Sequence, residues 1–340
     1  MCSFPVSNKS IEGTRRTEPT LNACSTYKGD QLDYIRFGRT ELNVSVMGLG
    51  CGGPSRIGLS TDKKESESVS IIRRAFDAGI NFVDTSEVYK TEGFIGEALQ
   101  EVGRDKIVVS TKINYRGEFS PTRLREGLEG SLKRLNTDYI DIYNLHGVNP
   151  EDYAYLRNEI LPTFEDLRNE GKIRFIGVTE MFGEDTHHEM LHLSLPDDFF
   201  DVVMVGFNIL NQSARNIFKL TQEKDVAVQL MYAVRRALSR PDKLIESIQT
   251  LIDECQLSPD DLDMEDPLGF VLEESDATSI VDAAYRFCRH EPGVHVVLSG
   301  TGNPAHLKSN IESLNRGPLP GALVEKLRRI FQHATAVNGN

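Results

Sequence analysis

The chain has 340 residues, of which 39% are hydrophobic and 26% charged, a composition typical of a soluble globular protein that can bury a large core. Its 51 acidic and 38 basic side chains leave a formal net charge of −13, and no run of Lys or Arg stands out. Because binding to a phosphate backbone requires a basic surface, we expect no nucleic-acid partner. No apolar stretch reaches the roughly 18 residues of a transmembrane helix, so we expect no membrane contact either.

Cysteine and histidine spacing argues against disulfides and metal sites. Five cysteines are scattered along the chain without CxxC spacing, at Cys2, Cys24, Cys51, Cys255 and Cys288. This pattern favours a reducing, cytoplasmic setting and no structural zinc. His187, His188 and His192 include an i, i+4 pair, but no third ligand is in view, and we interpret them as a solvated helix face.

The sequence divides into an N-terminal extension and a repetitive body. Residues 1–33 are polar, rich in Ser and Thr and free of helical or strand periodicity, which predicts a flexible extension. In residues 34–340, short apolar runs with β-branched residues alternate with longer stretches of helical spacing. The runs expected as strands are residues 44–50, 81–85, 107–111, 139–145, 175–179, 201–207, 226–232 and 294–299.

This alternation predicts an α/β fold, a closed (β/α)₈ TIM barrel formed as a single domain by residues 34–340. Apolar strands separated by helices indicate parallel strands buried on both faces, and eight such units fit a barrel better than an open doubly wound sheet. Residues 36–37 and 42–44 are expected to form an N-terminal hairpin below the barrel. The acidic residues 239–278 form a long loop after strand seven, which we expect to cover the substrate.

A glycine-rich segment at residues 48–53, GLGCGG, literally satisfies the G-x-G-x-x-G pattern of dinucleotide-binding folds. Its context does not, because Pro54 follows and no helix is expected before about residue 62. The acidic residue at the end of the second strand, Asp84, belongs to another motif. We therefore reject a Rossmann fold.

Four polar side chains follow the second, third and fourth predicted strands: Asp84, Tyr89, Lys112 and His146. In a barrel these strand ends share one face, where catalytic groups collect. A nearby ammonium such as Lys112 would lower the tyrosine pKa from near 10 and make Tyr89 a better proton donor, with Asp84 holding the lysine. His146 would hydrogen-bond a carbonyl oxygen. Each residue alone is more often structural, and their conjunction points to catalysis.

At these residues the sequence resembles the aldo-keto reductase superfamily, over about residues 34–316. The similarity is carried by the segments GINFVDTSEVY, LKRLNTDYIDIYNLH, EGKIRFIGVT and SGTGNPAHLKSN. It implies a barrel that binds a nicotinamide cofactor without a Rossmann motif, and it places the four residues above on the family's catalytic tetrad. The stretch ILPTFEDLRNEGKIRFIG is also weakly similar to the branch that contains plant L-galactose dehydrogenase.

The resemblance also implies a set of cofactor-binding positions, several of which depart from the family pattern. A Thr-Glu pair replaces the Ser-Asn pair that holds the carboxamide, methionines replace a Gln and the stacking aromatic, and a His replaces the Arg that often grips the 2′-phosphate. The positions are Thr179, Glu180, Met204, Met231, Arg235, Arg236, Gly300, Thr301, Gly302, Asn303, His306 and Asn310. The resemblance makes NADP(H) the expected cofactor, and these departures keep NAD(H) as the alternative.

We therefore predict an enzyme, an NADP(H)-dependent oxidoreductase that reduces an aldehyde or ketone by hydride transfer with Tyr89 as the general acid. Two alternatives stay open: an NAD-dependent sugar or alcohol dehydrogenase, and a non-catalytic cofactor-sensing barrel. The expected partner is a small carbonyl or alcohol. The sequence identifies neither the substrate nor the oligomeric state.

Overall fold

The computed structural model describes residues 32–61 and 63–340. The predicted extension at residues 1–33 lies outside this range except for Leu32 and Asp33. Eight strands alternate with helices through the described chain and form one sheet: β3 (Met47–Gly50), β4 (Phe82–Asp84), β5 (Val108–Ile113), β6 (Ile140–Val148), β7 (Ile173–Glu180), β8 (Val202–Gly206), β9 (Ala227–Met231) and β10 (Val296–Ser299).

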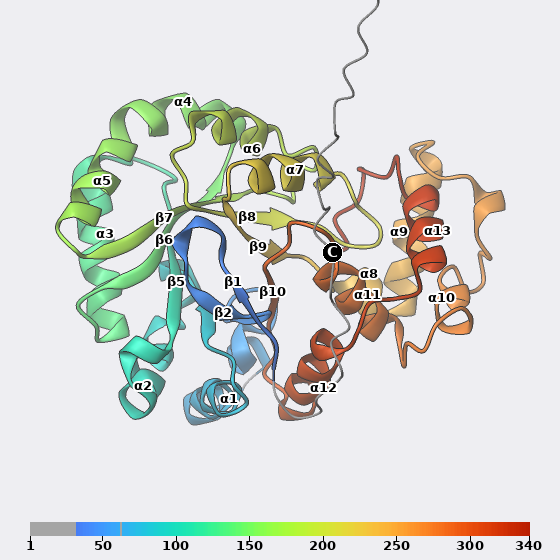
Figure 1. Ribbon diagram of the computed structural model, residues 1–340, viewed down its shortest axis with the longest axis horizontal. Helices are drawn as coiled ribbons and strands as arrows, with labels where there is room; N and C mark the ends of the chain where they lie inside the picture. The colour runs from blue at the N-terminus through green and yellow to red at the C-terminus, as the bar shows by residue number, and fades with distance from the viewer. Residues whose placement is uncertain (1–31, 62) are drawn as a thin grey trace, which may run out of the picture. The chain divides into compact units, whose positions relative to one another are not determined.

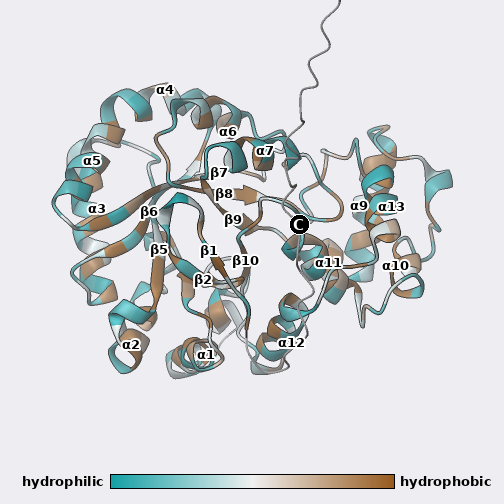
Figure 2. Ribbon diagram, in the orientation of Figure 1, coloured by the Kyte–Doolittle hydropathy of each residue, from teal (hydrophilic) through white to brown (hydrophobic). Residues whose placement is uncertain are grey.

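These strands close into a parallel barrel in the order β10-β3-β4-β5-β6-β7-β8-β9, which confirms the predicted (β/α)₈ fold (Figure 1). Their residues are almost all buried, because one face of each strand packs inside the barrel and the other against the helices. Figure 2 shows the same contrast, with hydrophobic strands inside and hydrophilic outer faces on the helices.

The helices surround the barrel, and several begin where the sequence provides a cap. Ser120 and Asn303 each accept a backbone N–H with their side chains, and each precedes a proline, Pro121 or Pro304. The helices are α1 (Glu65–Asp77), α2 (Glu92–Val102), α3 (Pro121–Leu135), α4 (Tyr153–Tyr155), α5 (Leu161–Asn169), α6 (Glu189–Ser194), α7 (Arg215–Glu223), α8 (Arg236–Ser239), α9 (Pro241–Asp253), α10 (Gly269–Glu273), α11 (Ile280–Arg289), α12 (Pro304–Asn315) and α13 (Gly321–Ile330).

The predicted hairpin is present as β1 (Tyr34–Arg36) and β2 (Asn43–Ser45), which pair antiparallel. Phe37 and Val44 from this hairpin are fully buried against residues at the beginnings of the barrel strands, among them Phe82, whose ring centroid lies 5.4 Å from that of Phe37. The hairpin therefore closes the end of the barrel where the strands begin. An active site has to lie at the opposite end, where the strands finish.

The long connection after β9 is largely helical and contains α9 and α10. It packs against the C-terminal part of the chain: Lys326 pairs with Glu274 at 2.6 Å and lies over the ring of Phe270, and Gln256 binds Thr335. In Figure 1, α9, α10 and α13 lie together beside the barrel. The packing explains why this acidic segment is folded, and the predicted role as a substrate cover stays a prediction.

Within the described residues, no helix combines the length and apolar character needed to span a membrane. The cytoplasmic location inferred from cysteine usage stays a prediction. Of the cysteines in this part of the chain, Cys51 and Cys288 are buried and free, and Cys255 is exposed and free.

Candidate active site

The centre of the site is a buried ion pair between neighbouring strands. Asp84 ends β4, and Lys112 lies on β5, where the two strands pair in parallel. The Lys112 ammonium lies 2.7 and 2.6 Å from the two carboxylate oxygens of Asp84 and donates a third hydrogen bond to the carbonyl of Thr85 at 2.7 Å. All three ammonium protons therefore have acceptors inside the protein, which fixes the position of the charge.

Tyr89 and His146 meet above this pair. The Tyr89 hydroxyl lies 3.1 Å from His146 Nε2, with the rings in a T-shaped contact, and the Lys112 ammonium lies 5.1 Å from the centroid of the Tyr89 ring. The structure thus brings together all four residues that the sequence singles out. They come from β4, β5, β6 and the short 3₁₀ helix Glu87–Tyr89 that follows β4.

Burial and charge set the protonation states of these groups. Burial, assisted by the positive charges of Lys112 and Arg116, lowers the pKa of His146 to about 3, so its imidazole is neutral at physiological pH. Burial also acts to lower the pKa of Lys112, but Asp84 and Tyr89 outweigh it, and the lysine stays charged. Burial raises the pKa of Tyr89 by more than Lys112 lowers it, in contrast to the lowered value expected from the sequence.

Further polar side chains support the ion pair from inside the barrel. Ser110 donates a hydrogen bond to Asp84 at 3.2 Å and accepts one from Asn144 at 3.1 Å, and both residues are fully buried. Glu87, which we expect to orient its loop, accepts hydrogen bonds from the backbone of Asn114 and from Arg123. These contacts hold the strand ends and the Tyr89 loop in a fixed relation.

The glycine-rich segment at the end of β3 serves this site in a way the sequence does not reveal. An added Cβ on Gly52 would lie 2.6 Å from Cζ of Tyr89, so the tyrosine ring occupies the space that any larger residue would need. Gly50 lies next to Gly300 of the loop after β10. The segment is therefore a packing surface for the Tyr89 ring and for that loop.

A cavity of about 350 Å³ opens beside Tyr89 and contains part of the predicted cofactor set. Met204, Met231, Arg235, Arg236 and Gly300 line it, together with Tyr232, which the sequence analysis did not include. The Arg235 guanidinium lies 3.9 Å above the ring of Tyr232.

The two residues predicted to hold the carboxamide have other partners. Thr179 accepts a hydrogen bond from the backbone of Gly147 at 2.7 Å. The carboxylate of Glu180 is buried and binds His188 Nδ1 at 2.8 Å and the backbone N–H of Gly206 at 2.7 Å. The expectation of a solvated His188 is therefore wrong: its ring is buried because it partners this carboxylate.

The loop after β10 lies at the N-terminus of α12, as the sequence predicts. Asn303 caps the helix, Thr301 accepts the N–H of Asn303, and the carbonyl of Gly302 accepts a 2.5 Å hydrogen bond from Lys63. His306 is exposed, whereas the Asn310 amide is buried and donates to Ser299 at 2.9 Å. Their cofactor roles stay predictions.

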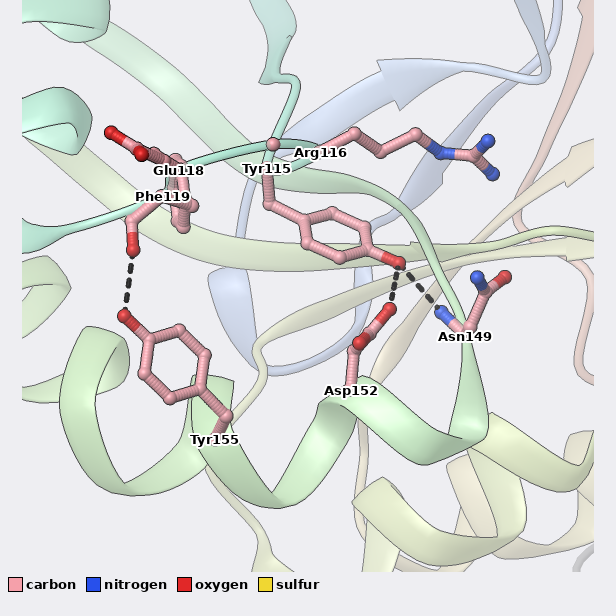
Figure 3. Close-up of a pocket in the computed structure, with 8 residues that line it drawn as sticks. Tyr115, Arg116, Glu118, Phe119, Asn149, Asp152 and Tyr155 are labelled. Carbon is pink, nitrogen blue, oxygen red and sulfur yellow. Dashed lines mark hydrogen bonds between the residues drawn. The ribbon is translucent and has the colours of Figure 1, made fainter.

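A second cavity, of about 440 Å³, lies between the loops that follow β5 and β6 (Figure 3). Tyr115 crosses it, donating to Asp152 at 2.8 Å and accepting from the backbone of Asn149 at 3.1 Å. Arg116 lies on its rim and is exposed. Both loops follow the C-terminal ends of barrel strands, at the end of the barrel that holds the tetrad.

Comparison with known proteins agrees with this geometry. The model of the aldo/keto reductase family matches residues 47–331. Oxidoreductase YqkF of Bacillus subtilis is 25% identical over 292 residues, which cover 82% of this chain and 90% of that protein. L-galactose dehydrogenase of Arabidopsis thaliana is 36% identical over 157 residues, which cover 44% of this chain and 49% of the plant enzyme.

Among solved structures, aldo-keto reductase AKR11C1 from Bacillus halodurans in its holo form superimposes with a TM-score of 0.68 at 25% identity. The match covers 90% of this chain and 98% of that protein. The barrel, the residues gathered at its strand ends and the extent of the family match lead to one conclusion. The chain belongs to the aldo/keto reductase family and is an NAD(P)H-dependent oxidoreductase.

Proposed function

We propose that this protein reduces an aldehyde or ketone to an alcohol, with Tyr89 as the proton donor and NADP(H) as the cofactor. The observation that carries the proposal is the contact between the Tyr89 hydroxyl and His146 Nε2, directly above the buried Lys112–Asp84 pair. When bound, the nicotinamide cofactor supplies the hydride at the carbonyl carbon.

The chain's own residues supply the proton and the positioning. A carbonyl oxygen placed within hydrogen-bond reach of both Tyr89 and His146 would accept the phenol proton as negative charge develops on it. The Lys112 ammonium stabilises the phenolate that remains, since it lies 5.1 Å from the centroid of the Tyr89 ring and Asp84 holds it in place. His146 is neutral and so can donate a hydrogen bond to that oxygen without repelling Lys112.

The residues around the 350 Å³ cavity suit a dinucleotide in part. Arg235 and Arg236 line the cavity and have no acidic partner among the described residues, which suits the charge of a pyrophosphate. Met204 and Met231 provide apolar walls, and Tyr232 an aromatic one. Both carboxylate oxygens of Glu180 have partners, so carboxamide binding through Glu180 requires side-chain rearrangement, whereas Thr179 and Asn310 each keep a further hydrogen-bonding group.

NADP(H) is the proposed form because two basic side chains stand near the loop after β10. Lys63 reaches the carbonyl of Gly302, and His306 is exposed on the first turn of α12. An NAD-dependent alcohol dehydrogenase is the second candidate. It is favoured by the replacement of the usual Arg by His306 and by the 36% identity to L-galactose dehydrogenase over about half of that enzyme.

Fluorescence titration with NADPH and NADH, followed by an aldehyde, ketone and sugar panel assayed in both directions, tests the proposal. We expect tighter NADPH binding and turnover of a carbonyl substrate. Tighter NADH binding with turnover of a sugar or other alcohol would favour the second candidate. Tight cofactor binding without any turnover would favour a non-catalytic barrel.

A further inference from the structure

Ser86 is a buried hydroxyl next to the catalytic groups, and the reaction outlined above does not use it. It lies between β4 and the 3₁₀ helix Glu87–Tyr89, has no solvent exposure and adopts an extended backbone conformation. Its Oγ lies 3.1 Å from His146 Nδ1 and 3.3 Å from the carbonyl oxygen of Lys112. Ser86 thus contacts the ring nitrogen of His146 that Tyr89 does not.

The hydrogen bonds around His146 can be arranged in two ways. The imidazole is neutral and carries a proton on one of its two nitrogens, because burial and the charges of Lys112 and Arg116 lower its pKa to about 3. In the first arrangement Tyr89 donates to Nε2, Nδ1–H donates to Ser86, and Ser86 donates to the Lys112 carbonyl. In the second, Ser86 donates to Nδ1 and Nε2–H donates to the Tyr89 oxygen.

Only the first arrangement directs the protons of Tyr89, His146 and Ser86 to acceptors within the protein. Within residues 32–61 and 63–340, the Tyr89 hydroxyl has no hydrogen-bonding neighbour besides His146 Nε2, so in the second arrangement the phenol proton has no protein acceptor. The Lys112 carbonyl also loses the Ser86 donor in that case. The first arrangement therefore makes three hydrogen bonds within the protein and the second makes two, which favours the first arrangement.

We propose that Ser86 is a positioning residue that holds His146 in its Nδ1–H tautomer in the substrate-free protein, with Nε2 as the acceptor for the Tyr89 phenol. The hydroxyl is suited to this because it accepts from Nδ1–H and donates to Lys112 at the same time.

This proposal concerns the same site as the function proposed above, and its consequence for catalysis rests on that function. A carbonyl oxygen requires a donor at Nε2, so the ring proton must exchange with cavity water and move to Nε2 when the substrate enters. Ser86 then turns and donates to Nδ1. One hydroxyl therefore satisfies His146 in both states, which an alanine would do in neither.

Nitrogen-15 NMR of the histidine ring in the full chain tests the assignment, with the His146 resonances identified by their loss in His146→Gln. We expect Nδ1–H in the wild type and Nε2–H in Ser86→Ala, because alanine leaves a buried Nδ1–H without an acceptor. Ser86→Thr keeps the hydroxyl and should restore Nδ1–H. Ser45→Ala is the matched control, since Ser45 is an equally buried, hydrogen-bonded serine near the start of β4, and it should leave the His146 resonances unchanged.

Two results would overturn the assignment: Nε2–H in the substrate-free wild type, or the same tautomer in the wild type and Ser86→Ala. If Ser86→Thr does not fold, the wild type, Ser86→Ala and Ser45→Ala still decide. In carbonyl reduction, Ser86→Ala should change kcat/KM by less than about threefold, because the lost hydrogen bond to His146 is missing in the substrate-free and the substrate-bound states alike. The NMR result needs no turnover, so failure of the proposed reaction and failure of the tautomer assignment are distinguishable.

Discussion

The ring of Tyr89 lies over the backbone of Gly52, and a Cβ added to Gly52 would lie 2.6 Å from the ring atom that bears the hydroxyl. No larger residue at position 52 is compatible with this ring position. Gly52→Ala should therefore displace the Tyr89 hydroxyl and lower kcat about 100-fold, since a shift of roughly 1 Å can cost that much.

Gly93→Ala is the matched control for this substitution. Gly93 lies in α2, and no atom is within 4 Å of its added Cβ, so both activity and stability should be retained or slightly improved. Steady-state kinetics and thermal unfolding of the two variants check the prediction. Undiminished kcat in Gly52→Ala would show that the ring position does not matter for the reaction.

The Lys112–Asp84 pair predicts strong non-additivity in stability. Lys112→Met leaves a buried carboxylate without its partner and should lower the free energy of unfolding by about 3–5 kcal/mol. Adding Asp84→Asn removes that charge, so the double variant should be more stable than Lys112→Met alone. Urea unfolding of the single and double variants measures this, and additive losses would contradict an ion pair.

His146 predicts a specific pH dependence of stability. Its pKa is about 3 in the folded protein and near 6.5 when unfolded, so the unfolded state takes up a proton first as the pH falls. The stability that His146 contributes is thus fully present above about pH 6.5 and is lost progressively toward pH 3. Across this window the free energy of unfolding should change less steeply with pH in His146→Asn than in the wild type. An unchanged slope would show that groups other than His146 cause the pH dependence.

Arg235 and His306 should affect cofactor binding differently. Arg235 has no acidic partner among the described residues and lines the cavity, so Arg235→Met should weaken NADPH and NADH binding alike, by about tenfold or more. His306→Ala should weaken only NADPH binding, because the two cofactors differ in the 2′-phosphate alone. Fluorescence titration of each variant with both cofactors measures the two effects. If Arg235→Met weakened NADPH binding alone, Arg235 rather than His306 would be assigned to the 2′-phosphate.

The barrel and the tetrad could be predicted because both follow from patterns that are regular along the chain. Runs such as residues 107–111 do not alternate between apolar and charged residues, which is typical of a strand covered on both faces. Parallel strands place their C-terminal ends on one face of the barrel. Lys112 and Asp84 therefore meet although 28 residues separate them.

The remaining features depend on the paths of loops, which have no periodic pattern. Glu180 and His188 face each other because the turn between β7 and α6 folds back, with His188 in a left-handed conformation at φ 60°. Gly52 matched a phosphate-binding pattern, but its real constraint is a tyrosine from a different strand end. Ser86 has no distinguishing signal in the sequence, because serines often follow strands, and its proposed role depends on its distance to His146.

The central claim is that Tyr89 donates the proton, and Tyr89→Phe tests it most directly, since the variant loses only the hydroxyl that contacts His146. With the carbonyl substrate identified from the panel, stopped-flow fluorescence can follow NADPH binding and NADPH oxidation in one experiment. We predict that Tyr89→Phe binds NADPH within about tenfold of the wild type, because one net hydrogen bond is the most that is lost, and oxidises it at least about 100-fold more slowly. Oxidation at the wild-type rate would contradict the claim.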